Sequence, residues 1–126
     1  MTVETLKKRK EFLRVRGGRR WSTPGFLLEG KRRESYRDGQ SGPRFGFTVT
    51  KKMGNAVARN RIRRRLRAIV SGLASEFADP TFDYVILARK PALDRPFKQL
   101  RADFEQGLLR IHRQTGSSPR RQSEQT

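Results

Sequence analysis

Hydrophobic and polar residues alternate over residues 44–50. Phe45, Phe47 and Val49 fall on one side of an extended chain, and the residues between them are Arg, Gly or Thr. This period of two predicts a strand with one buried face. Residues 82–88 (FDYVILA) are apolar on both sides, as is typical of a central strand with both faces covered. The two segments together indicate a sheet.

A helical period follows the first of these strands. Apolar residues recur at steps of four, four, three, four and four, at Ala58, Ile62, Leu66, Ile69, Leu73 and Phe77. At about 100° per residue these positions form one narrow stripe, which predicts a helix that packs on the sheet. Asn55 stands where the N-cap of this helix is expected.

Weaker patterns predict two further helices. A first helix runs from a cap at Thr2 or Thr5 to about Arg16, and Gly17-Gly18 ends it. A last helix covers residues 93–113, with Pro96 in its first turn. Its apolar members are Phe97, Leu100, Phe104, Leu108 and Ile111.

The remaining segments predict a short strand, a loop and a tail. Residues 26–28 follow Pro24-Gly25 and form the strand candidate, and residues 31–43 read as a polar surface loop. Residues 114–126 are Gly, Ser, Pro, Arg and Gln with little else, which predicts a disordered tail. We therefore expect one α+β domain over residues 1–113, a single small mixed sheet packed against helices.

The charge is large and unevenly distributed. Thirty Lys and Arg against 12 Asp and Glu give a formal net charge of +18. Residues 39–75 contain nine basic residues and no acid. A field of this kind attracts polyanions. A solvated basic surface would have interspersed acids, so it explains this segment poorly.

The predicted central helix carries six arginines in the nine residues 59–67. Like charges at this spacing destabilise an isolated helix, and planar guanidinium groups fork onto phosphate oxygens. A membrane-surface helix would need a wider apolar face. The pattern therefore favours nucleic acid. RNA is preferred over DNA because the helix is tied between two strands, and sheets with aromatic residues are typical of RNA readers.

Catalysis by protein side chains is not indicated. The chain has no cysteine, its 12 acids are scattered, and the only histidine, His112, is interpreted as a surface residue of the last helix. We expect no metal site on the protein alone. The charged N-terminus lacks the apolar core of a secretory signal, and no apolar run reaches the length of a membrane span. The expected compartment is the cytoplasm.

Residues 46–67 (GFTVTKKMGNAVARNRIRRRLR) resemble the signature of the bacterial ribonuclease P protein component family, with Arg59-Asn60-Arg61 at its centre. Residues 83–91 (DYVILARKP) resemble the family's next strand and its end, and residues 6–15 resemble its first helix. The resemblance implies the element order αβββαβα and a left-handed crossover around the arginine helix. Nothing in the periodicity indicates that handedness, which opposes the general right-handed rule.

The resemblance also implies a function. The chain would be the protein subunit of ribonuclease P, an endoribonuclease that removes the 5′ leader of precursor tRNA. The catalytic RNA would carry the chemistry, with Mg²⁺ held mainly by RNA. The partners would be that RNA, in a heterodimeric RNA–protein complex, and precursor tRNA, with neither membrane nor DNA.

Candidate RNA-binding residues follow from the matched positions. Those that match the RNA-facing motif are Lys51, Lys52, Asn55, Arg59, Asn60, Arg61, Arg65 and Arg67, and Arg63 shares their helix face. Those that match the leader site are Phe12, Arg89 and Lys90. Phe12 is either a stacking platform for a base or a core residue of the first helix. Family members often have a second aromatic four residues later, where this chain has Arg16.

Two other classes of protein stay open on composition alone. A ribosomal or other structural RNA-binding protein would need no single-strand cleft on its sheet. A DNA-binding protein would prefer duplex DNA to folded RNA.

Overall fold

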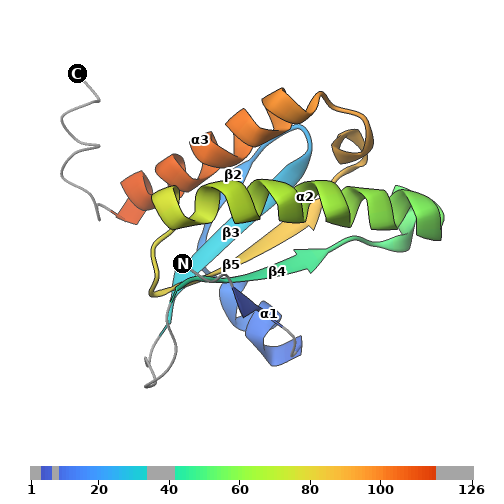
Figure 1. Ribbon diagram of the computed structural model, residues 1–126. Coiled ribbons are helices and arrows are strands. Elements are labelled where there is room, and N and C mark those ends of the chain that lie inside the picture. Colours follow the sequence, from blue (N-terminus) through green and yellow to red (C-terminus); the bar gives the residue numbers. More distant parts are fainter. Residues whose placement is uncertain (1–3, 7–8, 34–41, 116–126) are drawn as a thin grey trace.

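A computed structural model describes residues 4–6, 9–33 and 42–115, with the positions between and beyond these ranges left undescribed. These residues form a five-stranded sheet with three α-helices and two short 3-10 helices (Figure 1). In chain order the elements are β1 (Glu4–Thr5), α1 (Arg9–Val15), β2 (Arg19–Ser22), β3 (Phe26–Arg32), β4 (Arg44–Thr48), η1 (Lys51–Met53), α2 (Ala56–Phe77), β5 (Phe82–Ala88), η2 (Lys90–Leu93) and α3 (Phe97–Thr115).

The strand order across the sheet is β1-β4-β5-β3-β2. β5 lies at the centre, parallel to β4 and antiparallel to β3, as its two-sided apolar sequence predicts. Figure 1 shows α2 in front of the sheet, with β4 and β5 both pointing right and β5 above β4. Turned so that the strands point up, β5 lies to the left of β4. The β4–α2–β5 crossover is therefore left-handed.

The main core lies between the sheet and the pair α2 and α3. Four members of the predicted α2 stripe are at most 3% exposed, namely Ile62, Leu66, Ile69 and Leu73. They pack with an aromatic group in which Phe45 stacks on Tyr84 at 4.7 Å between ring centroids. Asn55 caps α2 as predicted, because its Oδ1 accepts a hydrogen bond from Ala58 N at 2.9 Å. In the described part of the chain no helix is long and apolar enough to cross a membrane.

The opposite face of the sheet is covered only in part, by α1. Leu6, Val15 and Val85 form a small buried cluster there, with Phe12 and Leu87 packed against it. Figure 1 shows α1 away from α2 and α3, on the other side of β4.

Several expectations at the ends of elements are wrong. Thr5 does not cap the first helix, because it lies in β1 and pairs with Phe45 of β4. The last helix begins at Phe97 rather than Leu93, which lies in η2, and it continues to Thr115. Residues 31–32 belong to β3 rather than to the predicted loop. Thr2, loop residues 34–41 and tail residues 116–126 lie outside the described residues.

The interpretation of His112 as a surface residue is also wrong. Its side chain is 6% exposed, and its Nε2 lies 2.6 Å from the hydroxyl oxygen of Tyr84. The ring also packs edge-on against Phe82. His112 is therefore part of the core, where it gives the Tyr84 hydroxyl a polar partner.

Candidate RNA-binding surfaces

The first candidate surface is the basic side of α2 with the 3-10 helix before it. Lys51, Lys52 and Asn55 are exposed just before the helix. Along the helix Asn60, Arg61, Arg64 and Arg67 are exposed, while Arg59, Arg63 and Arg65 are partly buried. We call these ten residues the α2 basic surface. The apolar stripe faces the sheet, so the cationic groups are left to solvent.

The arginines lie on two flanks of the helix. The Arg67 guanidinium lies 5.7 Å from the centre of the Phe47 ring, so that flank faces β4. Arg59 and Arg63 share this flank, since residues four apart are neighbours on a helix. Arg61 and Arg65 lie on the other flank, towards η2.

Arg65 is occupied by its own chain. Its Nη1 donates to the carbonyl oxygens of Ala92 at 2.9 Å and Leu93 at 2.6 Å, and its Nη2 donates to the carbonyl of Arg95. The side chain therefore ties the end of η2 to α2. Exposed Arg61, one turn earlier, has the charge without these bonds. The sequence grouped the two because both match the family's RNA-facing motif, and a motif cannot show what packs beside one flank of a helix.

The second candidate surface is a groove on the sheet face that carries α1. Its volume is about 500 Å³. We call it the α1 groove. Its lining residues are Arg9, Phe12, Leu13, Arg16, Glu29, Phe47, Thr48, Val49, Val85 and Leu87. It thus combines cationic and apolar walls.

Phe12 is placed in this groove by a glycine. A Cβ built on Gly46 would lie 2.4 Å from Phe12 Cε2, so the ring rests on the strand backbone. The side chain is partly buried, and one side of it contributes to the groove wall. The ring packs on the sheet and also faces the groove, so its role as a stacking platform for a base stays a prediction.

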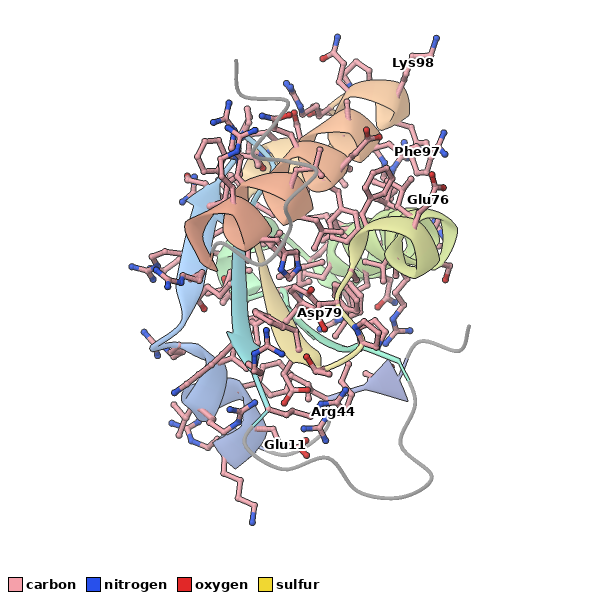
Figure 2. All side chains as sticks on the ribbon, turned by 90° about the vertical axis from the view of Figure 1, so that its left-hand side faces the viewer. Glu11, Arg44, Glu76, Asp79, Phe97 and Lys98 are labelled. Carbon is pink, nitrogen blue, oxygen red and sulfur yellow. The ribbon has the colours of Figure 1, made fainter. Side chains whose placement is uncertain are left out.

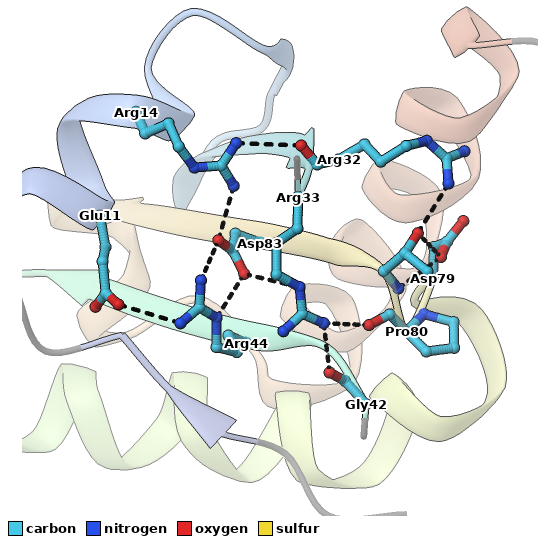
Figure 3. Close-up of polar contacts among 10 residues, drawn as sticks. Glu11, Arg14, Arg32, Arg33, Gly42, Arg44, Asp79, Pro80 and Asp83 are labelled. Carbon is cyan, nitrogen blue, oxygen red and sulfur yellow. Dashed lines mark hydrogen bonds and ion pairs between the residues drawn. The ribbon is translucent and has the colours of Figure 1, made fainter. Parts of the chain in front are cut away.

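A buried carboxylate fixes α1 over the sheet. Asp83 of β5 is fully buried and accepts hydrogen bonds from Arg14 of α1 at 2.8 Å and from Arg44 of β4 at 2.6 Å (Figure 3). Arg33 lies 3.6 Å from the same carboxylate, and Arg44 also donates to Glu11 of α1 at 3.1 Å. The hydrogen bond with Asp83 is the main reason that the pKa of Arg44 is raised above its ordinary value. These bonds set the position of α1 and so of Phe12.

Arg89 and Lys90 lie beyond the end of β5. Continuing the alternation of β5 places Arg89 on the α1 face with Asp83 and Val85. Its Nη1 donates to Ser22 Oγ at 2.7 Å and to the Thr23 carbonyl at 3.1 Å. Lys90 is exposed at the start of η2. Neither residue is among those that line the groove, so they lie past its end rather than in its wall.

Sequence reasoning missed most of the groove. Arg9 and Leu13 of α1 and Arg16 just after it were not predicted as site residues, nor was Glu29 of β3. The signal in α1 was present, because residues 9, 12, 13 and 16 are spaced i, i+3, i+4, i+7 and share one helix face. No signal marked Glu29, which is a lone acid in a strand.

The described residues offer no catalytic constellation. No group of three or more His, Cys, Asp or Glu among them is arranged to hold a metal ion. The acids nearest the groove form ion pairs with arginines. Glu11 pairs with Arg44, and Glu29 pairs with Arg20. The two surfaces are suited to binding a polyanion.

Comparison with known proteins decides the family. The family model described as ribonuclease P matches residues 2–112. The chain belongs to the ribonuclease P protein family. Ribonuclease P protein components from Brucella suis and Paramagnetospirillum magneticum are 48% and 42% identical over 107 and 110 residues. The alignments cover 82% and 86% of this chain, and 76% and 83% of those relatives.

Solved structures agree with this assignment. The ribonuclease P protein of Staphylococcus aureus superposes with a TM-score of 0.70 at 28% identity, covering 85% of this chain and 94% of that one. The Thermotoga maritima protein, at 24% identity, shows the same fold with a TM-score of 0.65 over 80% and 91% of the two chains. As a ribonuclease P protein component, the chain is a subunit of the endoribonuclease that matures the 5′ end of tRNA, and its partner is RNA. The alternative of a ribosomal protein is set aside.

Proposed function

We propose that this subunit holds two RNA segments on separate surfaces. The α2 basic surface binds the catalytic RNA, and the α1 groove binds the single-stranded 5′ leader of precursor tRNA. The observation that carries the proposal is the placement of the two surfaces: α2 and α1 lie on opposite faces of one sheet, so both segments can bind at once.

The α2 basic surface suits a folded RNA. Exposed Arg61, Arg64 and Arg67 stand on a rigid helix, and Lys51 and Lys52 extend the charge past its N-terminus. Guanidinium groups bind phosphate oxygens in bidentate fashion, and a helix fixes their spacing. An RNA backbone would also relieve the repulsion among these cations. Arg65 contributes mainly by holding η2 in place.

The α1 groove suits a single strand. Phe12 offers a ring face for a base, and Arg9 of α1 and Arg16 just after the helix line the same groove and can attract phosphates. Arg89 and Lys90 lie past the groove's end and extend the positive path. Stacking on aromatic rings combined with a cationic track is the general mode of single-strand binding. Because Arg16 takes the place of a second aromatic residue, phosphate contacts contribute more to leader binding than stacking does.

The chemistry belongs to the RNA in this proposal. We expect Mg²⁺ to be held mainly by the catalytic RNA and the substrate, since the donor sets described in this chain do not fit a metal ion. The protein would work as one half of an RNA–protein heterodimer in the cytoplasm, with no DNA or membrane partner. Its contribution would be to position the substrate.

Replacing Phe12 with alanine tests the leader site. We expect the assembled complex to bind leader-bearing precursor tRNA more weakly, by roughly 1–3 kcal/mol for one stacked base. Affinity for leaderless tRNA and for the catalytic RNA should be unchanged. Phe97→Ala is the matched control, because Phe97 is an aromatic residue 45% exposed on α3, away from α1 (Figure 2). Equal losses for both tRNA forms would refute a leader site at Phe12.

A further inference from the structure

One carboxylate oxygen on the wall of the α1 groove has no hydrogen-bond partner among the described residues. Glu29 is 1% exposed, and its Oε2 accepts a hydrogen bond from Arg20 Nη2 at 2.9 Å. Its Oε1 is buried and accepts no hydrogen bond from the part of the chain that the structure describes. Buried acceptors in native proteins are nearly always paired, and leaving one unpaired costs free energy. The position calls for a donor that arrives with a ligand.

The sheet register places this oxygen in line with Phe12. Gly46, Val85 and Glu29 are direct neighbours across β4, β5 and β3 on the α1 face. The Phe12 ring rests on Gly46 at one end of this row, and Glu29 stands at the other. Adjacent strands are about 4.8 Å apart, so the two ends are separated by roughly 10 Å. Phe12 and Glu29 both line the groove, so a nucleotide in it would meet the ring on one side and the carboxylate on the other.

The charge of the wall indicates which part of a nucleotide meets Glu29. Glu29 is the acid in a lining that also contains Arg9 and Arg16. A carboxylate repels phosphate and accepts hydrogen bonds from N–H groups of bases. The exocyclic amino groups of adenine, cytosine and guanine are such donors. Uracil offers only one ring N–H on this edge. It lies between two carbonyl oxygens, and the carboxylate would repel those oxygens.

We propose that Glu29 is a specificity residue that accepts a hydrogen bond from the amino group of a leader base, so that the groove prefers a base with an amino group to uracil at this position. The proposal rests on the leader site proposed above and assigns it a base preference. Arg20 is the positioning residue, because its bond to Oε2 leaves Oε1 to the ligand.

The same pairing makes Glu29→Gln informative. Arg20 can donate to an amide oxygen but not to an amide nitrogen, so it should hold the glutamine oxygen in place of Oε2. The amide NH₂ would then take the position of Oε1. The variant would present a donor where the native protein presents an acceptor, with almost no change in shape. We therefore expect the base preference to be lost or reversed.

The test compares leaders that differ only in the amino group. Precursor tRNAs carry leaders of roughly eight nucleotides, within the length of known single-strand sites. Adenosine is compared with purine ribonucleoside and cytidine with its 4-deamino analogue, so ring size and stacking are preserved. For the native complex we expect at least one amino-bearing leader to bind roughly three- to tenfold more tightly than its deamino partner. Glu29→Gln should abolish that ratio, and uridine leaders should gain affinity relative to the native complex.

A matched variant controls for the lost charge. Glu76→Gln removes the same charge from an exposed position on α2, on the other side of the sheet from α1 (Figure 2). It should keep the native ratios. Native complexes that bind both members of each pair equally, or a ratio that persists in Glu29→Gln, would overturn the proposal. If Glu29→Gln does not fold, the native ratios still decide.

The two proposals fail in distinguishable ways. A native complex that binds leader-bearing and leaderless tRNA equally would refute the leader site and this base preference with it. A clear gain from the leader with no dependence on amino groups would refute only the role of Glu29.

Discussion

The ring of Phe12 lies directly on the backbone of Gly46, and a Cβ at residue 46 would be 2.4 Å from Cε2 and 2.6 Å from Cζ of that ring. Strand β4 therefore needs glycine at this position for a packing reason, because hydrogen is the only side chain that leaves room for the ring. The contact joins the two elements that form the α1 groove.

Gly46→Ala should therefore displace Phe12. We expect the free energy of unfolding to fall by about 1–3 kcal/mol, as overpacking usually costs. The leader-dependent part of tRNA binding should fall as well, since the ring can no longer keep its place in the groove. Denaturant unfolding and binding of leader-bearing and leaderless tRNA measure the two effects. Gly72→Ala, at a helical site with open space, is the control. Unchanged stability and binding in Gly46→Ala would contradict the packing argument.

The sequence predicted the parts of the fold that have a strong period. The Ile62–Leu66–Ile69–Leu73 stripe and the two-sided strand 82–88 were confirmed, because burial of one helix face or of both strand faces leaves a regular mark. The α2 basic surface could be located for the same reason. Its arginines occupy the helix positions that lie outside the apolar stripe.

The sequence could not predict what depends on neighbours distant in the chain. β1 has two residues, and only its pairing with β4 makes it a strand. His112 was expected at the surface because polar residues surround it in the helix. Its hydrogen bond with Tyr84 of β5 allows the ring to be buried. Phe97 fits the α3 period but is 45% exposed, so no neighbouring element covers it fully. The α1 groove joins three strands and a helix, so no local pattern marks Glu29.

Asp83→Ala should loosen α1. The variant leaves Arg14 and Arg44 without their buried carboxylate, a change that typically costs about 3–5 kcal/mol. Denaturant unfolding gives the loss. In a double-mutant cycle with Arg14→Ala we expect clearly less than additive effects, since both changes break one contact. Strict additivity would show that Asp83 does not hold α1.

Alkaline pH should destabilise the protein through Tyr84. Burial raises the pKa of Tyr84 above its ordinary value of about 10. Above that pH the unfolded chain releases the phenol proton while the folded protein keeps it, so stability falls as pH rises, by up to about 1.4 kcal/mol per pH unit. Thermal unfolding from pH 9 upward, at roughly half-unit steps, measures the slope. Tyr84→Phe should have a shallower slope than the native protein. Identical slopes would show that Tyr84 ionises equally in both states.

Arg61 and Arg65 stand one turn apart on the same flank of α2, yet we expect their loss to affect different properties, RNA binding for Arg61 and stability for Arg65. Arg65→Ala should lower the free energy of unfolding by about 1–3 kcal/mol, because the carbonyls of Ala92, Leu93 and Arg95 lose their donor. Arg61→Ala should leave the melting temperature unchanged. It should weaken binding to the catalytic RNA and reduce the slope of log affinity against log salt by about one, as the loss of one phosphate contact does.

Arg65→Lys separates charge from geometry in the same experiment. Lysine keeps the positive charge but lacks the planar fork that reaches several carbonyls at once. The variant should therefore be destabilised nearly as much as Arg65→Ala while it keeps the native salt slope. Thermal unfolding and titration of the catalytic RNA at several salt concentrations give both quantities for all three variants. If Arg65→Ala melts like the native protein and lowers the salt slope as Arg61→Ala does, then Arg65 binds phosphate in the complex and its bonds to η2 contribute little.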